Sequence, residues 1–137
     1  MPISLEDCIA LGVELKEKEF RLTFEDNDLS HQNKQLKIKN LEVCFLLSEN
    51  FLDENFVPPV RILKFNKHYT RSVIRYCRLN DFVELINKRK YKIKFYATYY
   101  NGNKSLLILE LIKDDILQDR FECDIELNLE SIVYKWD

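Results

Sequence analysis

Residues 91–112 read YKIKFYATYYNGNKSLLILELI, and this stretch decides the fold. Apolar and polar side chains alternate along its first arm, as they do in a strand with one buried face. Its second arm is apolar on both sides, which is typical of a central strand covered on both faces. Asn101, Gly102 and Asn103 lie between the arms and are typical turn residues, so the stretch predicts a β-hairpin.

The length of the turn sets which residues face each other across this hairpin. A three-residue turn with a bulge places apolar residues opposite one another, in the pairs Ile93–Leu111, Phe95–Leu109 and Ala97–Leu107. It also places Lys94 beside Glu110 and Lys90 beside Asp114. A two-residue turn would move Glu110 to the apolar face, so we expect three residues. The polar face of the first strand then carries Lys92, Lys94, Tyr96, Thr98 and Tyr100.

Three further stretches show the alternation of a strand, at 13–25, 35–47 and 121–129, and a fourth strand is predicted at 60–65, which is apolar on both faces. In the second of these the apolar positions change parity after Asn40, which indicates a bulge near that residue. Residues 66–78 fit a strand and a helix equally well, and their pattern does not choose between the two.

The first residues predict a short helix at 1–12. Ser4 and Asp7 have the spacing of a capping box, and Gly12 is a natural stop. A longer helix that reaches Lys18 is the alternative interpretation.

Two more short helices are predicted, at about 80–90 and in the tail at 130–137. Asp81 and Glu84 form a second capping box at the start of the former. Cations occupy its last turn, where they favour the helix dipole, namely Lys88, Arg89 and Lys90. The tail has apolar residues at the spacing of one helical turn packed on the core, namely Ile132, Val133 and Trp136.

These elements place the chain in the α+β class, dominated by antiparallel strands. We expect a barrel-like or curved-sandwich arrangement of five or six strands with two or three short helices. At 137 residues the chain is expected to form a single domain, 1–137, which needs neither a metal nor a disulfide. Its content of 46% hydrophobic and 32% charged residues is that of a globular protein.

The composition excludes several kinds of active site. The sequence has two glycines, far apart, so it cannot form a phosphate-binding loop, a nucleophile elbow or a dinucleotide fingerprint. The only histidines are His31 and His68, and neither lies in a recognisable catalytic or metal-binding setting. We therefore expect no enzymatic activity, no cofactor and no metal.

The four cysteines are widely spaced and have no paired motif. We interpret them as reduced core residues of an intracellular protein, cytoplasmic or nuclear. A secreted domain with two disulfides is the alternative. The first residues lack the cationic and apolar regions of a signal peptide, and no apolar run reaches the roughly 20 residues of a membrane span. Neither secretion nor a membrane is therefore expected.

The charges divide the chain into three parts. Residues 61–94 carry eleven basic and two acidic side chains, a net charge of +9, between flanks of net charge −6 and −5. Six of the seven tyrosines fall in or just after this basic centre. Lysine and arginine neutralise phosphates, and tyrosine stacks on bases. Arginine and tyrosine are also residues that protein interfaces prefer.

We expect a non-enzymatic interaction module, a subunit or adaptor that docks a protein partner or a second copy of itself through this basic and aromatic surface. An OB-like domain that binds single-stranded nucleic acid is the alternative, and internal charge balance without any site is the third interpretation. The first two share their candidate binding residues, which are Tyr69, Arg71, Arg75, Tyr76, Arg78, Lys92, Lys94, Tyr96 and Tyr100.

The spacing Arg71-x-x-x-Arg75, followed by Asn103-x-Ser105, superficially resembles the two-part signature of PilZ-type cyclic-dinucleotide receptors. That signature ends in a glycine, and Ile108 stands in its place here. Ser105 also begins a predicted strand. The resemblance covers five positions and implies no ligand and no residue role for this chain.

Overall fold

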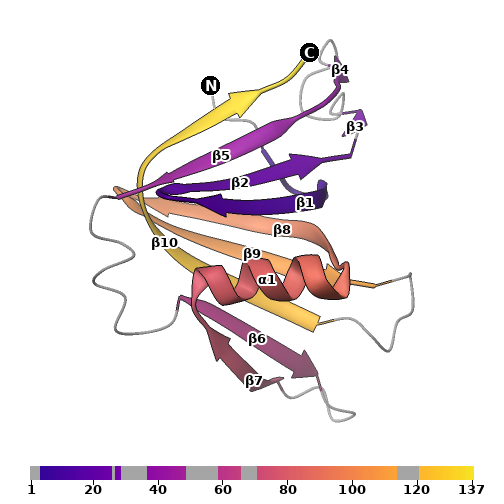
Figure 1. The fold of residues 1–137 in the computed structure, drawn as a ribbon, viewed down its shortest axis with the longest axis vertical. Coiled ribbons are helices and arrows are strands. Elements are labelled where there is room, and N and C mark those ends of the chain that lie inside the picture. The colour runs from indigo at the N-terminus through magenta and orange to yellow at the C-terminus, as the bar shows by residue number, and fades with distance from the viewer. Residues whose placement is uncertain (1–3, 26, 29–36, 49–58, 66–70, 114–120) are drawn as a thin grey trace.

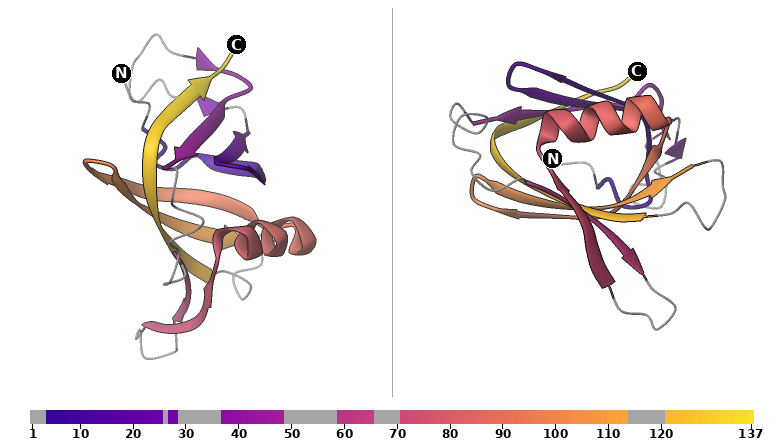
Figure 2. Two further views of the ribbon diagram at one scale, coloured as in Figure 1. Left: turned by 60° about the vertical axis from the view of Figure 1, so that its left-hand side comes forward. Right: turned by 60° about the horizontal axis from the view of Figure 1, so that its bottom comes forward.

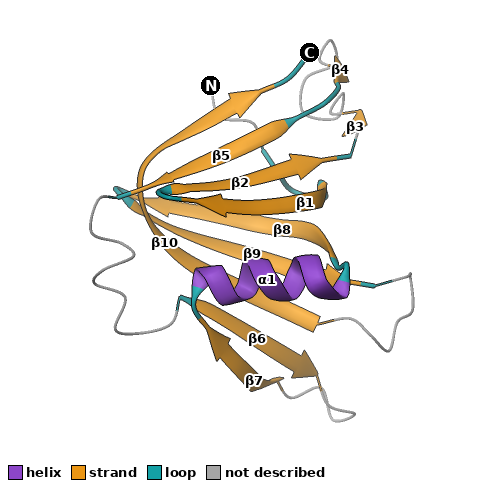
Figure 3. Ribbon diagram, viewed as in Figure 1, coloured by secondary structure: helices purple, strands orange, loops and turns teal. Residues whose placement is uncertain are grey.

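The computed structural model describes residues 4–25, 27–28, 37–48, 59–65, 71–113 and 121–137. These residues form ten strands and one helix. The strands are β1 (Ile9–Lys16), β2 (Glu19–Phe24), β3 (Asn27–Asp28), β4 (Lys37–Ile38), β5 (Glu42–Leu47), β6 (Val60–Phe65), β7 (Arg71–Cys77), β8 (Lys92–Asn101), β9 (Lys104–Ile112) and β10 (Phe121–Lys135), and the helix is α1 (Leu79–Arg89). Strands dominate, as the alternation predicts (Figure 3).

Six strands close into an antiparallel barrel. Their order is β5-β2-β1-β8-β9-β10, and β10 returns to pair with β5 (Figure 1). β6 and β7 extend the sheet from another part of β10, outside the barrel, and β3 and β4 form a separate two-stranded sheet. The barrel-like, mainly antiparallel arrangement expected from the sequence is confirmed.

β10 closes the barrel because it is long enough to pair with different strands in turn. Residues 121–128 pair with β9, and residues 122–125 also pair with β6 along the other edge. Beyond a bulge between Leu129 and Ser131, the rest of the strand pairs with β5. A bulge bends the strand that carries it, and Figure 1 shows β10 curving from the lower part of the barrel to the upper part.

The apolar faces of the strands fill the interior of the barrel. Its largest fully buried side chains include Phe20, Phe45, Phe82 and Phe95. The helix α1 lies across one end of the barrel (Figure 2) and adds Leu79, Phe82 and Ile86 to the same core. Asn87 fixes the helix to β1, because its Nδ2 donates a hydrogen bond to the carbonyl oxygen of Val13 at 3.2 Å.

Two of the three predicted helices are absent from the described residues, which contain one helix rather than two or three. The prediction of a helix at 1–12, or to Lys18, is wrong because β1 begins at Ile9. A bulge between Ala10 and Gly12 leaves the inward-facing Ala10 and Val13 three positions apart, which imitates helical spacing.

The predicted helical turn at 130–137 is also wrong. β10 continues to Lys135, and its last residues pair with β5. A strand that gains a ladder of backbone hydrogen bonds from a neighbour has no need of the local bonds of a helical turn.

The helix at about 80–90 is confirmed, but its capping box is wrong. The helix begins at Leu79, and Arg78 occupies the N-cap position without a side-chain hydrogen bond. Asp81 therefore lies inside the first turn, and Lys88 and Arg89 lie in the last turn, where each charge favours the helix dipole. The sequence pattern of 66–78 did not choose between a strand and a helix, and in the structure 71–77 form the strand β7.

β8 and β9 form the predicted hairpin with a different turn. Asn101 pairs with Lys104, so the turn has two central residues rather than three. They are Gly102 and Asn103, and Gly102 has a φ of 61°, which glycine adopts without strain. The three-residue turn was expected because a two-residue turn moves Glu110 to the apolar face. Instead, an extra residue in a bulge of β8 keeps Glu110 on the polar face although the turn has two residues.

This bulge lies at Tyr96, between Phe95 and Ala97, and divides β8 into two registers. Before it the predicted pairs are present, namely Ile93–Leu111, Lys94–Glu110 and Phe95–Leu109. After it, Ala97 pairs with Ile108 rather than with Leu107. Thr98 and Tyr100 consequently pair with inward-facing Leu107 and Ser105. The prediction that they share a face with Lys94 is therefore wrong.

The remaining expectations have mixed outcomes. The parity change at Asn40 marks a break between β4 and β5 rather than a bulge within one strand, and Asn40 has a φ of 53°. The four cysteines are unpaired and buried, as the prediction of reduced core residues requires. His31, His68 and the predicted contact of Lys90 with Asp114 lie outside the described residues.

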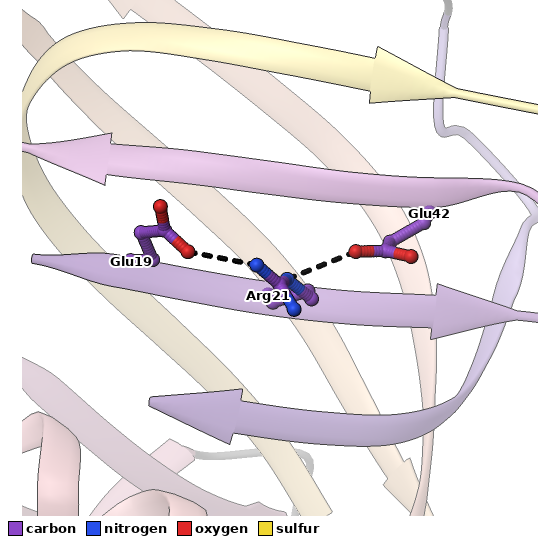
Figure 4. Close-up of polar contacts among 3 residues, drawn as sticks. All are labelled: Glu19, Arg21 and Glu42. Atoms are coloured by element: carbon purple, nitrogen blue, oxygen red, sulfur yellow. Dashed lines mark hydrogen bonds and ion pairs between the residues drawn. The ribbon is translucent and has the colours of Figure 1, made fainter. Parts of the chain in front are cut away.

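The acidic flanks neutralise some of their charge locally. On the outer face of the barrel, Arg21 of β2 lies between Glu19 and Glu42 (Figure 4). Its Nη2 is 2.8 Å from a carboxylate oxygen of Glu19, and its Nε is 2.9 Å from one of Glu42. Glu42 is the largest cause of the raised pKa of Arg21. These two carboxylates are therefore engaged within the flank and do not cover the basic centre.

Candidate partner-binding surface

The hairpin of β6 and β7 extends away from the barrel (Figures 1 and 2). Among the described residues, β7 pairs with β6 and with no other strand, so its second edge is open. An open edge presents a row of unpaired backbone N–H and C=O groups, to which another extended segment can bind.

Large apolar side chains are exposed on β7. Ile74 is 51% exposed, Tyr76 is 56% exposed and Val73 is 36% exposed. Val73 and Arg75 pair with the consecutive residues 63 and 62 of β6, so Ile74 is the extra residue of a bulge. Exposed apolar side chains gathered on a projecting element are typical of an interaction surface.

Two arginines flank these apolar side chains. Arg75 and Arg78 are both exposed, and neither forms an ion pair within the part of the chain that the structure describes. Arg78 directly precedes α1, whose N-terminus adds partial positive charge at the same place. Arg71 lies at the start of β7, and its side chain is outside the description, as is the whole of Tyr69.

The neighbouring Arg61 is engaged inside the protein. It pairs with Tyr76 across the hairpin, and its Nε and Nη2 donate hydrogen bonds of 2.8 and 2.6 Å to the two carboxylate oxygens of Asp124. This two-point contact is the main cause of the raised pKa of Arg61. The charge of Arg61 is thus balanced, whereas Arg75 and Arg78 have no such neighbour among the described residues.

Two of the candidate residues on β8, Lys94 and Tyr96, are also engaged. The hydroxyl of Tyr96 donates a hydrogen bond to the buried carboxylate of Glu110, and Lys94 lies opposite Glu110 across the hairpin. The Nζ of Lys94 is 5.5 Å from the centre of the Tyr96 ring, within the range of a cation–π contact. One face of that ring is therefore occupied, and Lys92 is the remaining exposed lysine of the strand.

The described candidate residues do not form one patch. β8 and β7 are separated by β9, β10 and β6, which is four inter-strand steps or about 19 Å. The outer face of β10 between them carries Glu122, Asp124 and Glu126, which alternate with the inward-facing residues of the strand. Arg75, Tyr76 and Arg78 are the predicted residues that the structure does bring together.

Tyr100 lies apart from both groups, at the tip of the β8–β9 hairpin. It lines an open pocket of about 490 Å³ between this tip and the second half of β10. Leu129, Ile132 and Tyr134 of β10 also line it. The prediction of a helical turn at 130–137 did not place these residues beside Tyr100, so the pocket was not expected from the sequence. The alternation of Ile132 and Tyr134 with Ser131 and Val133 was the signal for a strand there.

The chain matches no protein-family model, no curated protein and no solved structure. Across the described ranges, no three His, Cys, Asp or Glu residues are grouped so as to hold a metal ion. The helix found in these ranges is too short to cross a membrane.

Proposed function

We propose that this protein is a non-enzymatic interaction module that docks a partner protein on the β6–β7 hairpin. The observation that carries the proposal is the combination of Ile74, Arg75 and Tyr76, exposed on the open edge strand β7, with Arg78, exposed directly after that strand. The partner contributes an extended, acidic segment that pairs with β7 as an additional strand.

Each part of this surface has a role in such a complex. The backbone of β7 supplies affinity through main-chain hydrogen bonds, and its exposed side chains supply specificity. Tyr76 and Ile74 bury apolar area on binding, and tyrosine and arginine are frequent energetic centres of interfaces. Arg75 and Arg78 select carboxylates on the partner and disfavour the pairing of β7 with a basic strand.

The contacts on β8 make single-stranded nucleic acid the weaker candidate. A base-stacking platform needs free aromatic faces and cations, whereas the Tyr96 ring contacts Lys94 and its hydroxyl is bonded to Glu110. The carboxylates of Glu122 and Glu126 on β10 would also repel a phosphate backbone that crossed from β8 to β7.

Labelled peptides test the proposal directly. An extended peptide of alternating valine and glutamate is compared with its lysine counterpart by fluorescence anisotropy at low and moderate salt. We expect the acidic peptide to bind in a saturable manner, and Arg75→Glu/Arg78→Glu to weaken it about tenfold or more. The matched control is Lys88→Glu/Arg89→Glu, which makes the same change in charge at the far end of α1 and should retain binding.

Three results would contradict the proposal. The first is equal binding of the acidic and the basic peptide, and the second is loss of binding in the control variant to the same degree. The third is binding of a single-stranded oligonucleotide that Lys92→Glu/Lys94→Glu abolishes, which would favour the nucleic-acid function. Circular dichroism on each variant confirms that the barrel is intact.

A further inference from the structure

The second half of β10 is another open edge, independent of β7. The backbone N–H of Leu47 donates a hydrogen bond to the carbonyl oxygen of Lys18 at 2.7 Å. The backbone N–H and C=O groups of odd-numbered residues of β5 therefore point to β2, and those of even-numbered residues point to β10. The even-numbered residues of β5 pair with Ser131, Val133 and Lys135, whose backbone N–H and C=O groups therefore point to β5.

The backbone N–H and C=O groups of Ile132 and Tyr134 consequently point to the opposite edge. β9 pairs with β10 only as far as residue 128, and one further bond joins the N–H of Leu129 to Asn103 at 2.6 Å. Beyond it, no strand of the described chain pairs with this edge.

Residues 131–134 of this edge lack the features that normally prevent strands from associating. Exposed edges in monomeric proteins usually carry lysine, proline or an inward-pointing charge. Here residues 131–134 read Ser-Ile-Val-Tyr, without a charge or a proline, and Val133 is 37% exposed. Isoleucine, valine and tyrosine are also strong strand formers. The edge is therefore suited to pairing with another strand.

We propose that the same edge of a second copy of this chain covers it, so that two β10 strands pair antiparallel about a two-fold axis. In the register centred on Val133, Ile132 lies opposite Tyr134 of the second copy, and Ser131 lies opposite its Lys135. Glu130 lies opposite its Trp136. No like charges face each other, and a branched residue meets an aromatic one, which is a favourable cross-strand pair.

The charge pattern distinguishes β10 from the other open edge. Pairing of β7 with itself about Val73 would place Arg71 opposite Arg75, and pairing about Arg75 would place that arginine opposite itself. Like charges directly opposite destabilise a sheet. The pattern of β10 therefore permits self-association, whereas these two registers of β7 oppose it.

The pocket beside this edge supplies a second argument for the same register. The pocket has a volume of about 490 Å³ and lies between the tip of the β8–β9 hairpin and residues 129–134 of β10. Glu130 lines it. Trp136 is 46% exposed in the single chain. By alternation, Trp136 projects from the same side of the strand as Ile132 and Tyr134, which line the pocket.

The pairing places Trp136 of the second copy opposite Glu130, at this pocket. Glu130 then offers a carboxylate to the indole N–H, which needs an acceptor once it is buried. The two-fold axis fills both pockets with the same side chain. Backbone pairing, charge and the pocket thus lead to one arrangement.

Trp136 is the single tryptophan of the chain and serves as an internal probe. We expect sedimentation equilibrium to show a mass rising with concentration toward twice 16.5 kDa. Tryptophan emission should shift to shorter wavelength over the same concentrations, because the indole leaves water. A chain that stays monomeric up to about 100 μM, where a micromolar Kd would already be evident, would overturn the proposal.

Charge variants test the register. Ser131→Lys brings two lysines together at each Ser131–Lys135 contact and should weaken the dimer about tenfold. Lys135→Glu should have little effect by itself. Ser131→Lys/Lys135→Glu should restore the dimer, because a lysine then lies opposite a glutamate. Trp136→Ala also weakens it. Arg75→Glu/Arg78→Glu leaves it unchanged, so this proposal and the peptide-binding function fail separately. A dimer that neither Ser131→Lys nor Trp136→Ala weakens would show that a different surface associates.

Discussion

Two carboxylates, Glu110 and Asp124, are buried on the outward face of adjacent strands, and each meets a hydrogen-bond donor. A buried charge is tolerated when it is paired and hydrogen-bonded. The sequence predicted Lys94 as the neighbour of Glu110, and this is confirmed. It could not predict Tyr96 as the donor, because the bulge that turns that side chain toward Glu110 arises only when the hairpin forms.

Arg61→Met tests the second carboxylate. The side chain of Asp124 is 12% exposed, so the variant leaves a mostly buried charge without its two-point partner. We expect a loss of about 1–3 kcal/mol in the free energy of unfolding, measured by urea denaturation. Arg61→Met/Asp124→Leu removes both charges and should recover most of this loss. A double variant that is less stable than Arg61→Met would show that the unpaired carboxylate of Asp124 is not the source of the loss.

At the scale of elements, bulges account for the main errors of the sequence analysis. The bulge in β1 imitates helical spacing, and the bulge at Tyr96 allows a two-residue turn without moving Glu110 to the apolar face. Each bulge shifts the inward-facing set by one residue, so a strict period of two fails there. The strands β2, β5 and β8 lie where alternation predicts them, and β6 and β9 lie where runs that are apolar on both faces predict them.

Gly12 shows how closely strands approach at one of these bulges. A Cβ added at Gly12 would lie 2.6 Å from Oγ1 of Thr23 on β2. Gly12→Ala should therefore lower the free energy of unfolding by about 1 kcal/mol, because the two side chains overlap. In the background of Thr23→Ala, the same change should cost much less. A double-mutant cycle in urea measures this coupling.

Gly102→Ala is the contrasting control for this cycle. No atom lies within 4 Å of a Cβ at Gly102, but its φ of 61° strains any other side chain. Its cost, about 1 kcal/mol, comes from the backbone. Thr23→Ala should leave it unchanged, and an equal rescue of both alanine variants would contradict the overlap at Gly12.

For the whole molecule, closure of the barrel buries groups that titrate at alkaline pH. The pKa values of Cys44, Cys77 and Cys123 are raised, in each case chiefly by burial. Burial also raises the pKa of Tyr134, and the adjacent Tyr100 adds to the rise. These groups come from three strands, β5, β7 and β10.

The direction of the pH dependence follows from proton binding. Above about pH 9 the unfolded chain loses thiol protons that the folded chain keeps, so the unfolded state binds fewer protons. Stability should therefore be constant with respect to these groups at neutral pH and fall as the pH rises through 9 and 10. Urea midpoints at pH 7.5, 9 and 10 measure the fall, and Tyr134→Phe should reduce its upper part.

Thiol reactivity provides the control for this pH dependence. A disulfide reagent should react slowly with the native protein, because all four cysteines are buried. In guanidinium chloride the same reagent should react with all four thiols. Rapid reaction of a thiol in the native protein at pH 8 would show that the barrel opens locally. The alkaline loss of stability would then have another cause.

The sequence by itself determined that antiparallel strands dominate, that β8 and β9 form a hairpin and that a helix precedes it. Alternation and helix spacing depend on each residue's own neighbours, so they are visible in the chain. Only the tertiary structure decided that β10 runs on to close the barrel, that the basic centre is divided between β7 and β8, and that two strand edges stay open. The reason is that these features depend on pairing between residues far apart in the sequence, and a side chain is available to a partner only where that pairing leaves it exposed.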